Sequence, residues 1–222
     1  MYVTQIRPAA QVVLQQEQAL LKADPTYIQK DSFAVVIKDF EQEACFILML
    51  WALSILAYKG IAVWRQQKLL KRDLLQLPES MPIATEDTRT LAERLQQLPG
   101  NEQAYLLARA LRTGVERFSA TANVQSVSTS VRDVCGSEGD RFESELSTIR
   151  YIAWAIPSVG FIGTVRGIGN ALGQAHRAVE GDITGVTESL GTAFNSTFIA
   201  LVISILLMFF IHQLQLQQER LV

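Results

Sequence analysis

Three long runs without charged residues are the strongest pattern in the chain. They extend over Ala44–Tyr58, Tyr151–Val165 and Ser189–Ile211. An α-helix needs about 20 mostly apolar residues to cross the hydrocarbon core of a bilayer, and only the third run reaches that length by itself. The first run continues past Lys59, whose long side chain can reach the lipid head groups, and the second continues past Arg166. We therefore predict three membrane-spanning helices, over 40–64, 150–172 and 189–212.

Charges beside the first run indicate how the chain crosses the membrane. Four basic residues follow the run, at positions 65, 68, 71 and 72, whereas Asp39, Glu41 and Glu43 precede it. Segments rich in lysine and arginine beside a span stay in the cytoplasm. We therefore expect the N-terminus outside and, after three crossings, the C-terminus in the cytoplasm.

The segments outside the three runs have helical patterns of their own. Apolar residues at helical spacing occur over 91–98 and 106–118, on either side of the helix breakers at 99–101. Weaker spacing over 119–139 predicts a helix that continues towards the second span. We therefore expect an all-α membrane protein whose long helices extend into the cytoplasm. Its predicted parts are an outer N-terminal amphipathic segment (1–39), a first span (40–64), a cytoplasmic helical domain (65–149), a second span (150–172), an outer loop (173–188), a third span (189–212) and a cytoplasmic tail (213–222).

Composition limits the function without assigning one. Hydrophobic residues make up 49% of the chain and charged residues 19%, and the mean hydropathy of +0.17 fits a membrane protein with a soluble part. The net charge of −2 provides no basic field for nucleic acid. Cys45 and Cys135 fit no disulfide or zinc pattern, so both are predicted to be free. No spacing typical of metal ligands or of a catalytic nucleophile is visible, and we expect neither enzyme activity, nor a metal, nor a cofactor.

The third run contains polar residues that a lipid-facing anchor does not need. They are Thr192, Asn195, Ser196, Thr197 and Ser204. Membrane helices tolerate such side chains where they line a bundle interior or a water path. We therefore expect one of these two environments for the third span.

Small residues recur in the second span. Gly160, Gly163 and Gly167 have no side chain, so the backbone of a neighbouring helix can come close. Thr164 follows Gly160 by one turn and shares its face. Its hydroxyl either bonds a carbonyl of its own helix or reaches water or another helix. The residues by themselves favour the first alternative.

Two stretches of these spans resemble a known family. Residues 157–168 have the sequence Pro-Ser-Val-Gly-Phe-Ile-Gly-Thr-Val-Arg-Gly-Ile, similar to the proline and G-hydrophobic-hydrophobic-G-T-V-x-G-I signature of ExbB and TolQ proteins. Residues 197–202 resemble the T-A-I-G-L-V stretch of the same proteins. The expected topology also matches. The chain thus resembles the MotA/TolQ/ExbB proton channel family.

This resemblance implies the ring subunit of an ion-driven motor in a bacterial inner membrane. In that family a homopentamer surrounds the membrane helices of two copies of a single-span partner of the ExbD, TolR or MotB type. An aspartate in the partner's span takes up and releases the driving ion, expected here to be a proton. By resemblance the ion pathway contains Thr164 and Thr197, and Thr192, Asn195 and Ser204 are further candidates.

Two positions depart from the family pattern. Arg166 replaces the usual tryptophan, and it either pairs with a carboxylate or reaches the outer head groups, or it is an electrostatic partner for Glu188 or the partner's aspartate. Thr192 replaces a frequent glutamate. Glu188, one turn earlier, either substitutes for that glutamate or is a loop residue at the outer surface. No carboxylate of the chain lies safely inside a span, so we expect the partner to supply the proton-carrying group.

An arginine in a pore opposes the passage of cations. The alternative function is therefore a non-conducting membrane scaffold or assembly protein of the same fold.

Overall fold

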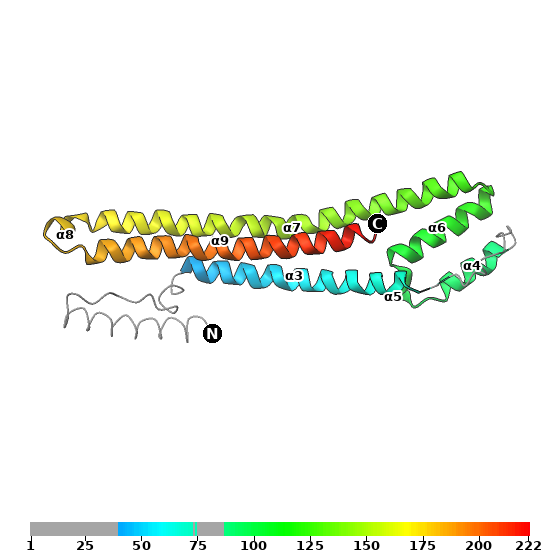
Figure 1. Cartoon of the computed structure of the whole chain (residues 1–222), viewed down its shortest axis with the longest axis horizontal. Helices are drawn as coiled ribbons and strands as arrows, with labels where there is room; N and C mark the ends of the chain where they lie inside the picture. Colours follow the sequence, from blue (N-terminus) through cyan, green and yellow to red (C-terminus); the bar gives the residue numbers. More distant parts are fainter. Residues whose placement is uncertain (1–39, 73, 75–86) are drawn as a thin grey trace. The chain divides into compact units, whose positions relative to one another are not determined.

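The computed structural model describes residues 40–72, 74 and 87–222, and these residues form helices and no strands. The prediction of an all-α fold is confirmed for this part of the chain, whereas the segment predicted over 1–39 lies outside the described residues. The helices, labelled in Figure 1, are α3 (Phe40–Leu70), α4 (Asp87–Gln96), α5 (Gly100–Gln103), α6 (Leu106–Thr121), α7 (Val124–Gly173), α8 (Ala175–Val179) and α9 (Thr184–Glu219).

Three of these helices, α3, α7 and α9, are long and apolar enough to cross a membrane. This confirms the three spanning helices predicted from the apolar runs. Helix α7 has 50 residues and α9 has 36, whereas a single crossing needs about 20. Both helices therefore continue beyond one crossing, and the limits of the membrane along them stay a prediction.

The described residues belong to two compact units. Unit 1 contains 40–54 and 150–209, and unit 2 contains 55–149 and 210–222. Helices α3, α7 and α9 each contribute residues to both units.

In unit 1, α7 and α9 pack so closely that three positions of α7 admit only glycine. A Cβ atom added at any of them would lie 2.5–2.8 Å from a Cβ atom of α9, closer than real Cβ contacts. The glycines and their small partners recur every three or four residues, so each set lies on one helix face. The opposed pairs are Gly160–Ala200, Gly163–Ser196 and Gly167–Ala193.

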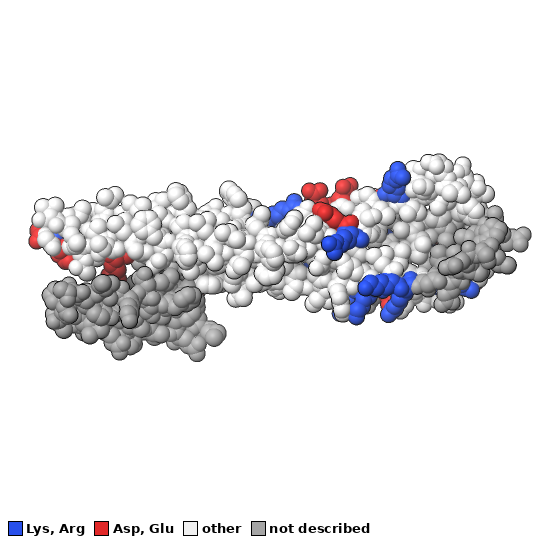
Figure 2. All heavy atoms as spheres, viewed as in Figure 1, with Lys and Arg blue, Asp and Glu red and all other residues white. Residues whose placement is uncertain are grey.

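The outward side of unit 1 is apolar. Large aromatic side chains there are more than half exposed, and on the face shown in Figure 2 charged atoms are scarce over the unit 1 helices. Such a surface is costly in water, at about 25 cal/mol per Å², but lipid tails are as apolar as the side chains themselves. The exposed aromatic residues include Trp51, Trp154, Phe161 and Phe198.

A tight turn joins α8 to α9. Gly181 has a φ of +97°, which residues with a Cβ atom rarely adopt. The N–H of Thr184 donates to the carboxylate of Asp182 at 3.1 Å and so caps the start of α9. The side chain of Thr184 and its N–H together lower the pKa of Asp182. The turn thus holds a carboxylate at the end of α9 where the helix dipole is positive.

In unit 2 the helix predicted over 119–139 is interrupted, which corrects that prediction. Ala122 has left-handed backbone with a φ of 48°. Asn123 then starts α7, because its side chain accepts hydrogen bonds from the N–H groups of Gln125 and Ser126 at 2.9 and 3.3 Å. The valines at helical spacing, at positions 124, 127, 131 and 134, all follow the break and therefore did not indicate where α7 begins. The available signal was Asn123, a preferred helix N-cap.

Ion pairs join the helices of unit 2. Lys59 of α3 donates to Glu145 of α7 at 2.7 Å, and Arg109 of α6 donates to the buried Glu138 of α7 at 2.8 Å. The sequence predicted that the Lys59 side chain reaches the lipid head groups. In the structure it pairs with a carboxylate of α7, which was not expected.

We expect Gly160→Ala and Gly167→Ala to weaken the contact between α7 and α9, because each added methyl group overlaps an alanine of α9. The cost is about 1–3 kcal/mol, measured as a lower midpoint of thermal unfolding in detergent. Gly169→Ala is the matched control, since it lies on the same helix with nothing within 4 Å of its Cβ position. Equal midpoints for all three variants would contradict the close contact.

Candidate functional site

Two threonines meet where α7 and α9 lie closest. The hydroxyls of Thr164 and Thr197 hydrogen-bond to each other, and either can be the donor. Each hydroxyl has a single hydrogen, and the alternative acceptors within reach are the carbonyl of Ala193 for Thr164, at 3.2 Å, and that of Gly160 for Thr197, at 3.1 Å. The contact of Thr164 with Gly160 in its own helix, at 3.4 Å, is present as well. The structure therefore brings the two residues together, and their part in ion passage stays a prediction.

Arg166 forms an ion pair that connects α7 to α3. Its guanidinium donates to the carboxylate of Glu41 at 2.8 Å. The Arg166 side chain is 48% exposed and the Glu41 side chain only 6%. A buried carboxylate without a counter-charge would be strongly destabilising. Of the alternatives considered for Arg166, pairing with a carboxylate of this chain is thus present in the structure.

Glu41 is a buried carboxylate, and the expectation that no carboxylate of the chain lies safely inside a span stays a prediction. It belongs to the first turn of α3, within the predicted first span. The next residue, Gln42, is also buried, and its amide donates to the hydroxyl of Ser196 at 3.5 Å. In the sequence, Glu41 stands with Asp39 and Glu43 in an acidic flank of the apolar run. A signal was available, because an arginine in one span requires a counter-charge in another.

A polar pocket of about 340 Å³ lies beside Arg166 in unit 1. Glu188 and Thr192 both contribute to its wall. The two positions that depart from the family pattern, Arg166 and Thr192, therefore border the same cavity. Glu188 lies in α9, which begins at Thr184, and this corrects its assignment to a loop. Asn170 and Gln174 add amide groups to the wall. The wall of the pocket is thus polar and contains one basic side chain, Arg166, and one acidic side chain, Glu188.

The wall of this pocket does not include Asn195, which is half-buried on α9. Its place in an ion pathway stays a prediction.

Ser204 has a structural partner that its sequence context did not reveal. Pro157 lies inside α7, and because proline has no N–H it leaves the carbonyl of the residue four positions earlier without its helical donor. That residue is Ala153, and the hydroxyl of Ser204 donates to its carbonyl at 2.9 Å. The geometry thus gives Ser204 a role in satisfying the helix backbone.

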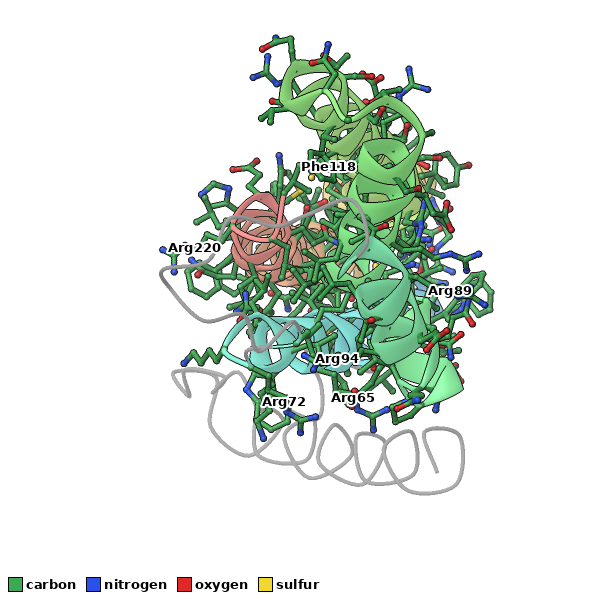
Figure 3. The ribbon with its side chains drawn as sticks, turned by 90° about the vertical axis from the view of Figure 1, so that its right-hand side faces the viewer. Arg65, Arg72, Arg89, Arg94, Phe118 and Arg220 are labelled. Atoms are coloured by element: carbon green, nitrogen blue, oxygen red, sulfur yellow. The ribbon has the colours of Figure 1, made fainter. Side chains whose placement is uncertain are left out.

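A larger, apolar cavity of about 630 Å³ lies in unit 2. Its walls include Leu106 and Phe118 of α6 and Val127 of α7. Figure 3 shows Phe118 on the inner side of α6, with Arg89 and Arg220 at the edges of the view. Cys135, at the same wall, is free, as is Cys45, which confirms the prediction for both cysteines.

A comparison with models of protein families matches residues 102–222, more than half of the chain, to the MotA/TolQ/ExbB proton channel family. The matched region contains the threonine pair, Arg166 and the wall of the polar pocket, whereas Glu41 lies outside it. No curated protein and no solved structure matches the chain significantly.

We expect Ser204→Ala to lower the free energy of unfolding by about 1–3 kcal/mol, because the carbonyl of Ala153 loses its donor inside the bundle. Pro157→Ala restores an N–H to α7. In that background the same serine substitution should therefore cost much less. Denaturation of the two single variants and the double variant measures the difference. Equal costs in both backgrounds would show that Ser204 does not compensate for the proline.

Proposed function

We propose, because this chain belongs to the MotA/TolQ/ExbB proton channel family, that it is the ring and pore subunit of a motor driven by the proton-motive force. The chain is a multi-pass inner-membrane protein with the candidate spans α3, α7 and α9. In this proposal five copies form the ring, and α7 and α9 of each copy face its centre.

The threonine pair is the observation that carries this proposal. Thr164 and Thr197 place two half-buried hydroxyls at the contact between α7 and α9. A hydroxyl is both a donor and an acceptor, so it can bond a carboxylic acid and, after reorientation, the carboxylate that remains when the proton leaves. A fixed charge at the same place would favour only one of these forms. Threonines therefore suit a carboxyl group that changes its protonation state at each step.

Two interhelical ion pairs support a placement of the spans. Glu145 and Arg166 are 21 residues apart along α7, about 32 Å at 1.5 Å per residue, close to the roughly 30 Å of the hydrocarbon core. Their partners Lys59 and Glu41 are 18 residues apart along α3, about 27 Å. Arg150 lies between Glu145 and Arg166 and therefore within the proposed membrane region, but its long side chain can extend to the head groups beside Glu145. We therefore place the membrane between the two pairs.

The basic residues after the first span set the orientation in this proposal. Arg65, Lys68 and Arg72 follow the span, and Lys68 lies over the ring of Trp64 at 3.8 Å from its centroid. Positive charge and an interfacial tryptophan together are typical of the cytoplasmic end of a span. The predicted cytoplasmic domain (65–149) would then lie in the cytoplasm, and the pair of Arg166 with Glu41 would lie near the outer surface. In this proposal the N-terminus is outside and the C-terminus is in the cytoplasm.

The proposed partner is a single-span protein of the ExbD, TolR or MotB type with a membrane aspartate. Two copies of its helix would occupy the centre of the ring. The ion gradient would drive protonation and release of the aspartate next to the threonines, and this cycle would turn one component against the other.

A non-conducting scaffold of the same fold is the alternative, and Arg166 is the observation that favours it. An uncompensated arginine repels cations from a pore. Its pair with Glu41 offsets that charge within the same chain, and for this reason we prefer the motor.

Oligomeric mass and proton flux test the proposal. The chain is purified alone and with a co-expressed single-span protein that has one membrane aspartate. We expect a pentamer of the 24.7 kDa chain that takes up two partner copies and conducts protons in liposomes. Thr164→Ala and Thr197→Ala should lower the flux at least about tenfold, a barrier increase of about 1.4 kcal/mol.

Thr129→Ala is the matched control, because the exposed Thr129 of α7 donates only to the carbonyl of Gln125, in its own helix, at 3.0 Å. It should leave the flux unchanged. A monomer or dimer that does not bind the partner would contradict the motor proposal and favour the scaffold.

A further inference from the structure

Unit 2 has a strip of exposed basic side chains at the end of α3. The strip consists of Arg65 and Lys68 in the helix and Lys71 directly after it. Figure 3 shows Arg65 directed outward from α3. Lys68 lies over the ring of Trp64, and within the described part of the chain none of the three basic groups has an ion pair. We call these three residues the basic strip.

A strip of exposed acidic side chains lies on α7 in the same unit. Asp133 and Asp140 are 7 residues apart, close to two helical turns, so they share one face. Ser137 lies between them on this face and is also exposed. Among the described residues neither aspartate has an ion pair. Arg132 points about 100° away from Asp133 around the helix and thus belongs to another face. Asp133 and Asp140 form the acidic strip.

Helices α3 and α7 run in opposite directions. On α3, Glu41 precedes Lys59. Their ion-pair partners on α7 occur in the reverse order, because Arg166 follows Glu145. The pair of Lys59 with Glu145, the reference pair, marks a common level of the two helices within unit 2. From this level towards the strips, residue numbers rise along α3 and fall along α7.

The two strips extend over the same levels. Arg65 lies 6 residues from the reference pair and Asp140 lies 5, which are about 9 and 8 Å along their helices. Lys71 and Asp133 each lie 12 residues from it, about 18 Å. Each chain therefore presents opposite charges at equal levels on two different helices, and these charges do not pair with each other within the chain.

A closed ring requires two such surfaces on one chain. Neighbouring copies in a ring meet through a heterologous interface, in which two different patches of the same chain come together. Rotation about an axis along the membrane normal keeps every residue at its level, so only patches at equal levels can meet. Opposite charges across an interface select which faces meet. Because each exposed ion pair contributes little stability, the strips would select the contact and not hold the ring by themselves.

We propose that the basic strip of one copy docks against the acidic strip of the next copy in the ring. Arg65 then lies opposite Asp140 of the neighbouring copy, and Lys71 lies opposite its Asp133. The inference rests on the ring of the proposed function and identifies the faces by which the copies meet. Anionic lipid head groups are the competing partner of the basic strip, but they would repel the aspartates at the same level.

Cross-linking between two differently tagged full-length chains in native membranes tests this contact. One chain contains Lys68→Cys and the other Ser137→Cys, and both contain Cys135→Ser to remove the half-buried native thiol. We expect a short bismaleimide to join the two tags. Ser128→Cys in place of Ser137→Cys is the matched control. It is exposed on the same helix but lies 9 residues, about 14 Å, further along α7, so it should not be joined.

Charge reversal then tests whether opposite charges select the contact. Arg65→Glu on the Lys68→Cys chain places a carboxylate against Asp140 of the neighbour and should lower the yield about threefold, within the range measured for exposed ion pairs. Asp140→Lys on the Ser137→Cys chain makes the charges opposite again and should restore the yield. Rescue by a substitution on the other chain cannot come from the fold of either chain alone.

Three results would overturn the inference. The first is a cross-link that forms equally well with Ser128→Cys, and the second is a yield that does not respond to the Arg65→Glu reversal. The third is a loss that Asp140→Lys does not restore, which would assign Arg65 to the lipid head groups. A pentamer without this cross-link would overturn the inference and leave the motor proposal intact. A cross-linked ring that conducts no protons would support the inference and contradict the motor.

Discussion

The glycine contact between α7 and α9 determines where every polar group of unit 1 can reach. A threonine side chain is short, so Thr164 bonds across the contact only because the two backbones lie close together. At Gly160 an added Cβ atom would lie 3.3 Å from the Cα atom of Thr197 and 2.5 Å from the Cβ atom of Ala200. Any larger residue would move Thr197 away from its partners. The glycines are therefore a condition for the hydroxyl pair as well as for the packing.

This contact also limits which polar groups the bundle can contain. In a membrane an unsatisfied polar group costs several kcal/mol, so each must find a partner on its own or an adjacent helix. Ser204 bonds the carbonyl of Ala153, and Glu41 pairs with Arg166. Ser204 donates to a backbone carbonyl, whereas Arg166 pairs with a carboxylate and also contributes to the wall of the polar pocket.

The parts of the structure that follow from local rules could be predicted from the sequence. The lengths of the apolar runs predicted the three long helices, because the thickness of the hydrocarbon core sets how many apolar residues a spanning helix needs. The contact of Glu41 with Arg166 could not be predicted from periodicity, since it joins residues 125 positions apart. The break at Ala122 was missed because the apolar spacing that predicted the helix begins only after it, at position 124. The partner of Ser204 follows from Pro157 once a proline inside a helix is taken to leave one carbonyl without a donor.

The ion pair of Arg166 with Glu41 joins α7 to α3 and neutralises a carboxylate that is almost fully buried. A buried ion pair contributes little net stability, because the cost of removing the charges from water offsets their attraction. Removal of Arg166 would nevertheless be costly, because Glu41 would then be a buried charge without this counter-ion. The two residues are therefore compatible with the bundle only as a pair.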